Sequence, residues 1–222
     1  MKVFYKIINT LATLTLIPVL LFLPMFRFIA VVGANSSNQL LSLLGGMLDI
    51  NEIINRITGI DIENLPEFYT IPEVIDLFTG EAANGVFSQI DASYLPEAAI
   101  NSFMAAGILF AFALLCAVII IVIGLFTKKK LVAASFAGLG FLSTFAANKC
   151  FTFVAEQFVS GKISVSQILS KLEAFEKYAK YVDMINFDIR IFELGSAYTM
   201  MLVIFGALAL LSVGFYLAES TT

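Results

Sequence analysis

The sequence contains no histidine and no tryptophan, and it has only two cysteines and five prolines in 222 residues. Without histidine there is no Ser-His-Asp or Cys-His catalytic group and no HExxH zinc motif. Two cysteines in separate hydrophobic segments exclude a structural zinc site and a disulfide scaffold. No GxGxxG or GxxxxGK[ST] motif is present to indicate nucleotide binding. We therefore expect no enzymatic activity, no metal and no cofactor.

Charged residues are also scarce, at 14% of the chain, whereas 59% of residues are hydrophobic and the mean hydropathy is +0.93. A soluble domain carries about 25% charged residues, so the composition excludes a soluble globular protein. Four segments hold almost no charge, and each exceeds the roughly 20 residues that a helix needs to cross the hydrocarbon core. The predicted class is an all-α integral membrane protein with four transmembrane helices and a small helical extracellular cap.

The predicted order along the chain is a cytoplasmic start with the first span (1–32), a long acidic exterior loop (33–97), the second span (98–127), a basic turn (128–130), the third span (131–155), a second exterior loop (156–193), the fourth span (194–217) and a cytoplasmic end (218–222). The basic start also resembles a signal peptide. The apolar run of about 20 residues before Arg27 is longer than a signal core of about 7–15 residues, which favours a membrane anchor.

Basic residues predict the orientation. They form two groups, Lys2 and Lys6 before the first span, and Lys128, Lys129 and Lys130 between the second and third. Positive charge in short flanks stays cytoplasmic, and two crossings separate the groups, so both predict the same orientation. Segment 33–98 holds ten acids and one arginine, a net charge of −9, and is then exterior. We expect a plasma-membrane protein with both termini in the cytoplasm.

The two exterior loops are predicted to contain short helices that together form the cap. Thr70 to Glu73 and Ser164 to Gln167 each match a capping box. Apolar residues over 40–48 recur with helical spacing, and one amphipathic helix is predicted from about 165 to 183. Its apolar face packs on the first loop, on the outer leaflet or on another chain. The acids are solvated surface or weakly attract cations, and Asn35 begins a glycosylation sequon that matters only in a eukaryotic host.

Arg27 and Lys149 are the two cations predicted within the spans. Arg27 is the 21st residue from Ile7, and Lys149 is the 19th from Leu131. At about 1.5 Å per residue, both fall near the outer edge of the hydrocarbon. They snorkel to headgroups, pair with acids of the cap, or surround a vestibule that attracts anions. We expect at least one of them to contact a carboxylate of the cap.

Small residues spaced three or four apart mark faces on which helices approach closely. The candidate positions are Gly107 with Ala111, Ala113 with Ala117, Ala133 with Ala137, Ala134 with Gly138, Ser143 with Ala147, and Gly206 with Ala209. Such faces serve either packing within the four-helix bundle or an interface between subunits.

Four spans, both ends inside, a long first exterior loop and a shorter second one form a layout that is similar to that of claudin-type tetraspan proteins. The similarity is one of topology, because the claudin first loop carries a tryptophan motif and two cysteines that this chain lacks. We expect a non-enzymatic accessory or self-associating subunit. Its expected partners are the lipid bilayer and other membrane subunits or copies of itself, and not nucleic acid. The alternative is a pore-forming or transport subunit of an oligomer, although no Asp or Glu lies in the central part of a span.

Overall fold

The computed structural model describes residues 2–34, 66–74, 92–126, 129–169, 171 and 185–220. The chain divides into two compact units. Unit 1 comprises Met1–Met25, Ser102–Thr152 and Leu194–Thr222, and unit 2 comprises Phe26–Asn101 and Phe153–Glu193. The described residues include four helices that are long and apolar enough to cross a membrane. The protein is therefore a mostly helical membrane protein, as its composition predicts.

The first hydrophobic segment forms two consecutive helices, α1 (Lys2–Leu14) and α2 (Leu16–Phe22). They are separated one turn before Pro18. Proline has no backbone N–H, so Pro18 cannot donate to the carbonyl of Leu14, where a regular helix would place a hydrogen bond. The interruption follows from this missing donor.

The second of these helices ends before Pro24, and the chain continues as strand β1 (Phe26–Ala34). Leu23 is extended, with φ −92° and ψ 142°, because a following proline disfavours the helical conformation of the residue before it. The prediction of a helix that continues to Val32 is therefore wrong. Arg27 lies on β1 and not on a membrane helix.

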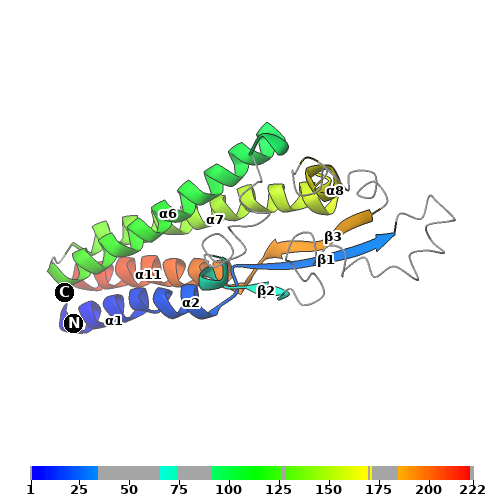
Figure 1. Ribbon diagram of the computed structural model, residues 1–222. Coiled ribbons are helices and arrows are strands. Elements are labelled where there is room, and N and C mark those ends of the chain that lie inside the picture. The colour runs from blue at the N-terminus through cyan, green and yellow to red at the C-terminus, as the bar shows by residue number, and fades with distance from the viewer. Residues whose placement is uncertain are drawn as a thin grey trace. The chain divides into compact units, whose positions relative to one another are not determined.

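The other three predicted spans are the helices α6 (Glu97–Phe126), α7 (Lys130–Val159) and α11 (Ser196–Ser220), close to the expected ranges 98–127, 131–155 and 194–217. In unit 1, α6 and α11 stop at the end of the bundle where α1 and α7 begin (Figure 1). We call this the terminus end of unit 1.

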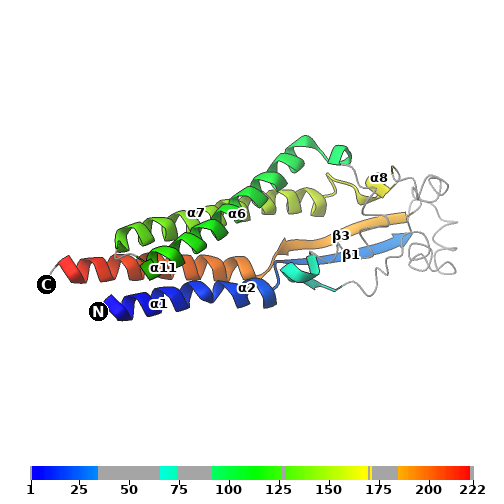
Figure 2. The ribbon, with the colours of Figure 1, turned by 60° about the vertical axis from the view of Figure 1, so that its left-hand side comes forward.

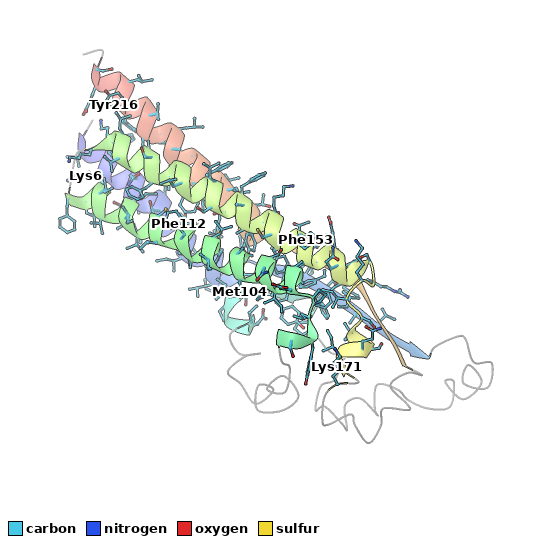
Figure 3. The ribbon with its side chains drawn as sticks, turned by 90° about the horizontal axis from the view of Figure 1, so that it is seen from above. Lys6, Met104, Phe112, Phe153, Lys171 and Tyr216 are labelled. Atoms are coloured by element: carbon cyan, nitrogen blue, oxygen red, sulfur yellow. The ribbon has the colours of Figure 1, made fainter. Side chains whose placement is uncertain are left out.

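The first helix is polar on its buried face and apolar on its exposed face. Tyr5, Asn9 and Thr13 recur every four residues and are at most 4% exposed. The exposed positions are Val3, Phe4, Ile7, Leu11 and Leu14. A surface helix of a soluble protein has the opposite arrangement, whereas polar side chains of membrane helices face the bundle interior. Apolar side chains such as Phe112 of α6 likewise project outward (Figure 3).

Unit 2 contains a three-stranded sheet in the order β2–β1–β3, in which β2 (Phe68–Tyr69) and β3 (Ile185–Leu194) flank β1. β1 and β2 are antiparallel, and Arg27 lies opposite Phe68. β1 and β3 lie side by side with their arrows in opposite directions (Figure 2).

This sheet corrects the all-α class and the prediction of a helical cap, because neither included strands. β3 forms where apolar and polar residues alternate from Ile185 to Ile191, and a period of two is that of a strand. Short helical elements accompany it: residues 71–74, η3 (Ala92–Tyr94) and α8 (Val165–Leu169). The helix expected over 40–48 and most of the amphipathic helix beyond α8 lie outside the described residues, as does Asn35.

Aromatic side chains pack the sheet of unit 2. The ring of Phe192 on β3 lies 5.9 Å from Phe26, 5.6 Å from Phe28 and 5.8 Å from Phe158, measured between centroids, and all three pairs meet edge to face. Phe26 also stacks on Tyr69 of β2 at 5.1 Å. Such ring pairs stabilise a core by about 0.5–1.5 kcal/mol each beyond their area burial.

Candidate functional site

Arg27 is the centre of an ion-pair site in unit 2. Its guanidinium pairs with Glu67 through Nε and Nη2, and its Nη1 lies 3.4 Å from Oε1 of Glu193. The ring of Phe68, opposite Arg27 in the sheet, lies 5.5 Å from the guanidinium carbon. The hydrogen bond to Glu67 is the main cause that raises the pKa of Arg27. The expected contact between one of the two cations and an acid of segment 33–98 is therefore present, as Arg27–Glu67.

Lys149, the other predicted cation, is exposed on α7. Its Nζ lies 5.6 Å from the ring centroid of Phe145, one turn earlier on the same helix. An ammonium group at this distance from an aromatic face is attracted by the ring. The structure thus places the two cations in different settings, an ion pair on a strand for Arg27 and an aromatic contact on a helix for Lys149.

At each of the two capping boxes found in the sequence, the structure shows one of the two reciprocal hydrogen bonds that define the motif. The carboxylate of Glu73 accepts from the backbone N–H of Thr70 at 2.6 Å and from its hydroxyl at 2.8 Å. These two bonds, the backbone bond first, lower the pKa of Glu73. At the start of α8, the N–H of Gln167 donates to Oγ of Ser164 at 3.4 Å. The described part of the α8 apolar face packs within unit 2, because Ile168 is buried in a cluster with Ala99, Ile163, Tyr94, Leu95 and Phe158.

The three consecutive lysines do not share one environment. Lys128 lies outside the described residues and Lys129 is exposed, but Lys130 is only 4% exposed. Its Nζ lies 3.1 Å from the carbonyl oxygen of Phe215 and 2.9 Å from Oε1 of Glu219, both on α11. The sequence pattern predicts that all three lysines are cytoplasmic charges that set the orientation. It gives no sign that one of them is buried in an ion pair.

The rings of Tyr5 and Phe215 complete the surroundings of Lys130, with centroids 5.3 Å and 5.5 Å from Nζ. The hydroxyl of Tyr5 is also hydrogen-bonded to Oγ of Ser212 at 3.0 Å. Residues from α1, α7 and α11 therefore meet in one polar cluster at the terminus end of unit 1. The sequence signal for it was the four-residue spacing of Tyr5, Asn9 and Thr13.

The small-residue faces divide into buried and exposed sets. Ala113, Ala117, Ala133, Ala137 and Ala147 are at most 7% exposed and pack inside the bundle. Gly107 and Ala111 are exposed on α6, and their role in helix packing stays a prediction. Six residues of helix turn through about 600°, which places Gly107 and Ala113 on different faces of α6. Ala134 and Gly138 are half-buried, and a side chain added at Gly138 would meet no atom within 4 Å. Gly206 is also half-buried, and an added Cβ would touch the Phe141 ring at 3.8 Å.

The two cysteines are free, Cys116 buried in α6 and Cys150 half-buried in α7. Across the described ranges there is no group of three or more His, Cys, Asp or Glu side chains that could hold a metal ion. Several of the polar contacts described above join different elements, Lys130 and Tyr5 with α11 in unit 1 and Arg27 with Glu67 and Glu193 in unit 2. Comparisons of the chain with protein families, with curated proteins and with solved structures found no match.

Proposed function

We propose that the chain is a non-enzymatic multi-pass protein of the plasma membrane that acts as an accessory or self-associating subunit of a membrane complex. Unit 2 is its interaction module, and the membrane helices contribute further contacts. The observation that carries this proposal is that the segments between the hydrophobic helices belong largely to a compact unit of their own, with a sheet, an aromatic cluster and the Arg27 ion pair. A compact unit of this kind offers a partner a shaped surface.

In this proposal unit 2 is exterior and both termini are cytoplasmic. The supporting observation is that Lys6, Lys129 and Lys130 gather at the terminus end of unit 1, and basic residues beside spans stay cytoplasmic. A cysteine at Ser88, placed in the Cys150→Ser protein, should react with a membrane-impermeant maleimide on intact cells. Reaction only after the membrane is disrupted would reverse the orientation.

Two buried hydroxyl groups of the membrane helices support packing rather than the alternative of a pore. Thr13 donates to the carbonyl of Asn9 at 2.7 Å, and Thr144 donates to the carbonyl of Gly140 at 2.8 Å. Both bonds stay within one helix and satisfy the hydroxyl without water. A pore-forming or transport subunit would instead direct such groups toward a hydrated path.

Purification from native membranes in a mild detergent, with mass measurement, tests the proposal. We expect a complex larger than one chain of 24.2 kDa, with either a second protein or further copies. Arg27→Gln should reduce retention of the partner because it removes the ion pair of unit 2, whereas Lys149→Gln is the matched control. A chain that is always monomeric contradicts the proposal. Ion conduction or solute uptake by the purified chain alone in vesicles would replace it with the pore alternative.

A further inference from the structure

Two helices stop at the terminus end of unit 1, and each leaves backbone carbonyls to be satisfied. The last four carbonyls of a helix have no partner within it, and they carry the negative end of the helix dipole. Carbonyls at a helix end need a hydrogen-bond partner wherever side chains shield them from water. Lysines from the two helices that begin at the same end reach these helix ends: Lys6 binds Leu125, one of the last four carbonyls of α6, and Lys130 binds Phe215, in the turn just before the last four carbonyls of α11.

The first lysine is Lys6 of α1, which binds a backbone carbonyl near the end of α6. Its Nζ donates to the carbonyl of Leu125 at 2.8 Å, one residue before α6 ends. One turn further along α1, Nδ2 of Asn9 lies 3.4 Å from the carbonyl of Ile120. A side chain at Gly124 would come within 2.7 Å of the same Nδ2, so Asn9 occupies the space that this glycine leaves. The first helix is thus fastened to backbone groups in the last two turns of α6.

The second lysine is Lys130 of α7, which serves the end of α11. It binds the carbonyl of Phe215 and the carboxylate of Glu219, five residues and one residue before α11 ends at Ser220. Burial between the rings of Tyr5 and Phe215 takes the charge out of water. The lysine side chain of this pair is 3% exposed and that of Glu219 is 34% exposed, so loss of the carboxylate would leave a buried ammonium without its counter-charge, which is far more costly than losing a surface pair.

We propose that Lys6 and Lys130 form a reciprocal clamp, in which each helix that begins at the terminus end holds the carboxyl end of a helix that stops there. Lys6 of α1 holds α6, and Lys130 of α7 holds α11. The clamp is a separate role from orientation. Lys129, exposed beside Lys130, contributes to the charge that sets the orientation, whereas Lys130 acts through its contacts with α11.

The test compares Lys130→Met with Lys129→Gln by amide hydrogen exchange in detergent, read over residues 215–220. Both variants lose one positive charge, but only the first loses the clamp. Because Lys130→Met removes both the bond to the Phe215 carbonyl and the pair with Glu219, exchange over 215–220 should accelerate at least about tenfold in this variant and change less than about twofold in Lys129→Gln. Equal rates in the two variants overturn the proposal.

A second variant separates the clamp from the charge count. Thr127→Lys combined with Lys130→Met restores the number of lysines in the turn without restoring the contacts with α11. Exchange should remain fast, and a return to the wild-type rate would mean that charge alone matters. If Lys130→Met does not accumulate, Glu219→Ala gives the same measurement with Lys130 in place, and an unchanged rate there also overturns the proposal. Lys6→Met should accelerate exchange over 122–126 of α6 and leave 215–220 unchanged, and any other pattern contradicts the pairing of α1 with α6.

Discussion

Among the glycines that the structure describes, Gly195 leaves the least room for an added methyl group. It precedes α11, and an ideal Cβ there would overlap the carbonyl oxygen of Pro24 and lie 2.6 Å from its carbonyl carbon. Carbon atoms in favourable contact are about 3.5–4.0 Å apart. Gly195→Ala therefore requires the backbone at Pro24 and at Gly195 to separate by about 1 Å.

The two backbone segments that would have to separate are joined by two hydrogen bonds. The N–H of Gly195 donates to the carbonyl of Met25 at 2.8 Å, and the N–H of Ala197 donates to the carbonyl of Pro24 at 3.1 Å. Each bond contributes about 1 kcal/mol net, and overpacking adds about 1–3 kcal/mol. The sum of about 3–5 kcal/mol is a large part of the roughly 5–15 kcal/mol that holds a domain folded. At about 2–4 °C per kcal/mol for a chain of this size, Tm should fall by about 10 °C.

The assay is thermal unfolding of the purified protein in one detergent, with Gly214→Ala as the matched control. Gly214 lies on the same helix α11, and a Cβ added there meets no atom within 4 Å. The control should leave Tm within about 2 °C of the wild type, because a single alanine in open space changes stability by less than about 1 kcal/mol. A Tm for Gly195→Ala equal to that of the control would refute the close contact between the start of α11 and Pro24.

Three further predictions concern other contacts. Gly140→Ala should lower Tm by a few degrees, because the added Cβ would lie 2.5 Å from the fully buried ring of Phe205 and overpacking costs about 1–3 kcal/mol. Gly138→Ala, whose Cβ would meet nothing within 4 Å, should leave Tm unchanged, and equal Tm values in the two variants would disprove the Gly140 contact. Arg27→Gln should speed limited proteolysis of segment 33–98, because Glu67 in that segment loses its ion-pair partner, whereas Lys149→Gln should leave the rate unchanged. An unchanged rate in both variants would show that Arg27 does not stabilise this segment. Thr70→Val should raise the pKa of Glu73 in an NMR titration, because the variant lacks the hydroxyl bond that helps to lower this pKa, and an unshifted titration would contradict the bond. The stability that the capping bonds add is present above the ordinary pKa of Glu73 and is lost as pH falls through the lowered pKa.

The membrane helices were predictable because their signal is strong and local. Runs of more than 20 apolar residues have few alternatives to a membrane helix, and α6, α7 and α11 begin and end within a few residues of the expected positions. The ion pair of Arg27 was predictable for a different reason. A net charge of −9 in segment 33–98 made an acidic partner easy to find, although the sequence did not single out Glu67.

The strands were missed because hydropathy alone does not separate a buried strand from a helix. β1 begins within the first apolar run, and two features separate it from α2: Pro24, which makes Leu23 extended, and the aromatic and β-branched residues after it. β3 carries a clearer sign, the strict alternation from Ile185 to Ile191. Its partner was beyond prediction, since pairing with β1 joins residues more than 150 positions apart in the chain.

The interior of unit 1 shows how much a few polar residues specify in a membrane bundle. Spacing alone identifies the buried face of α1, because Tyr5, Asn9 and Thr13 fall on one side. It does not say which helix that face meets, since hydrocarbon gives no preference among apolar neighbours. The choice is made by groups that complement each polar side chain, Ser212 for Tyr5 and the open space at Gly124 for Asn9. Because a polar group in hydrocarbon finds no water when its protein partner is absent, these few contacts favour one pairing of helices, and close packing such as that of Gly140 against Phe205 adds to it.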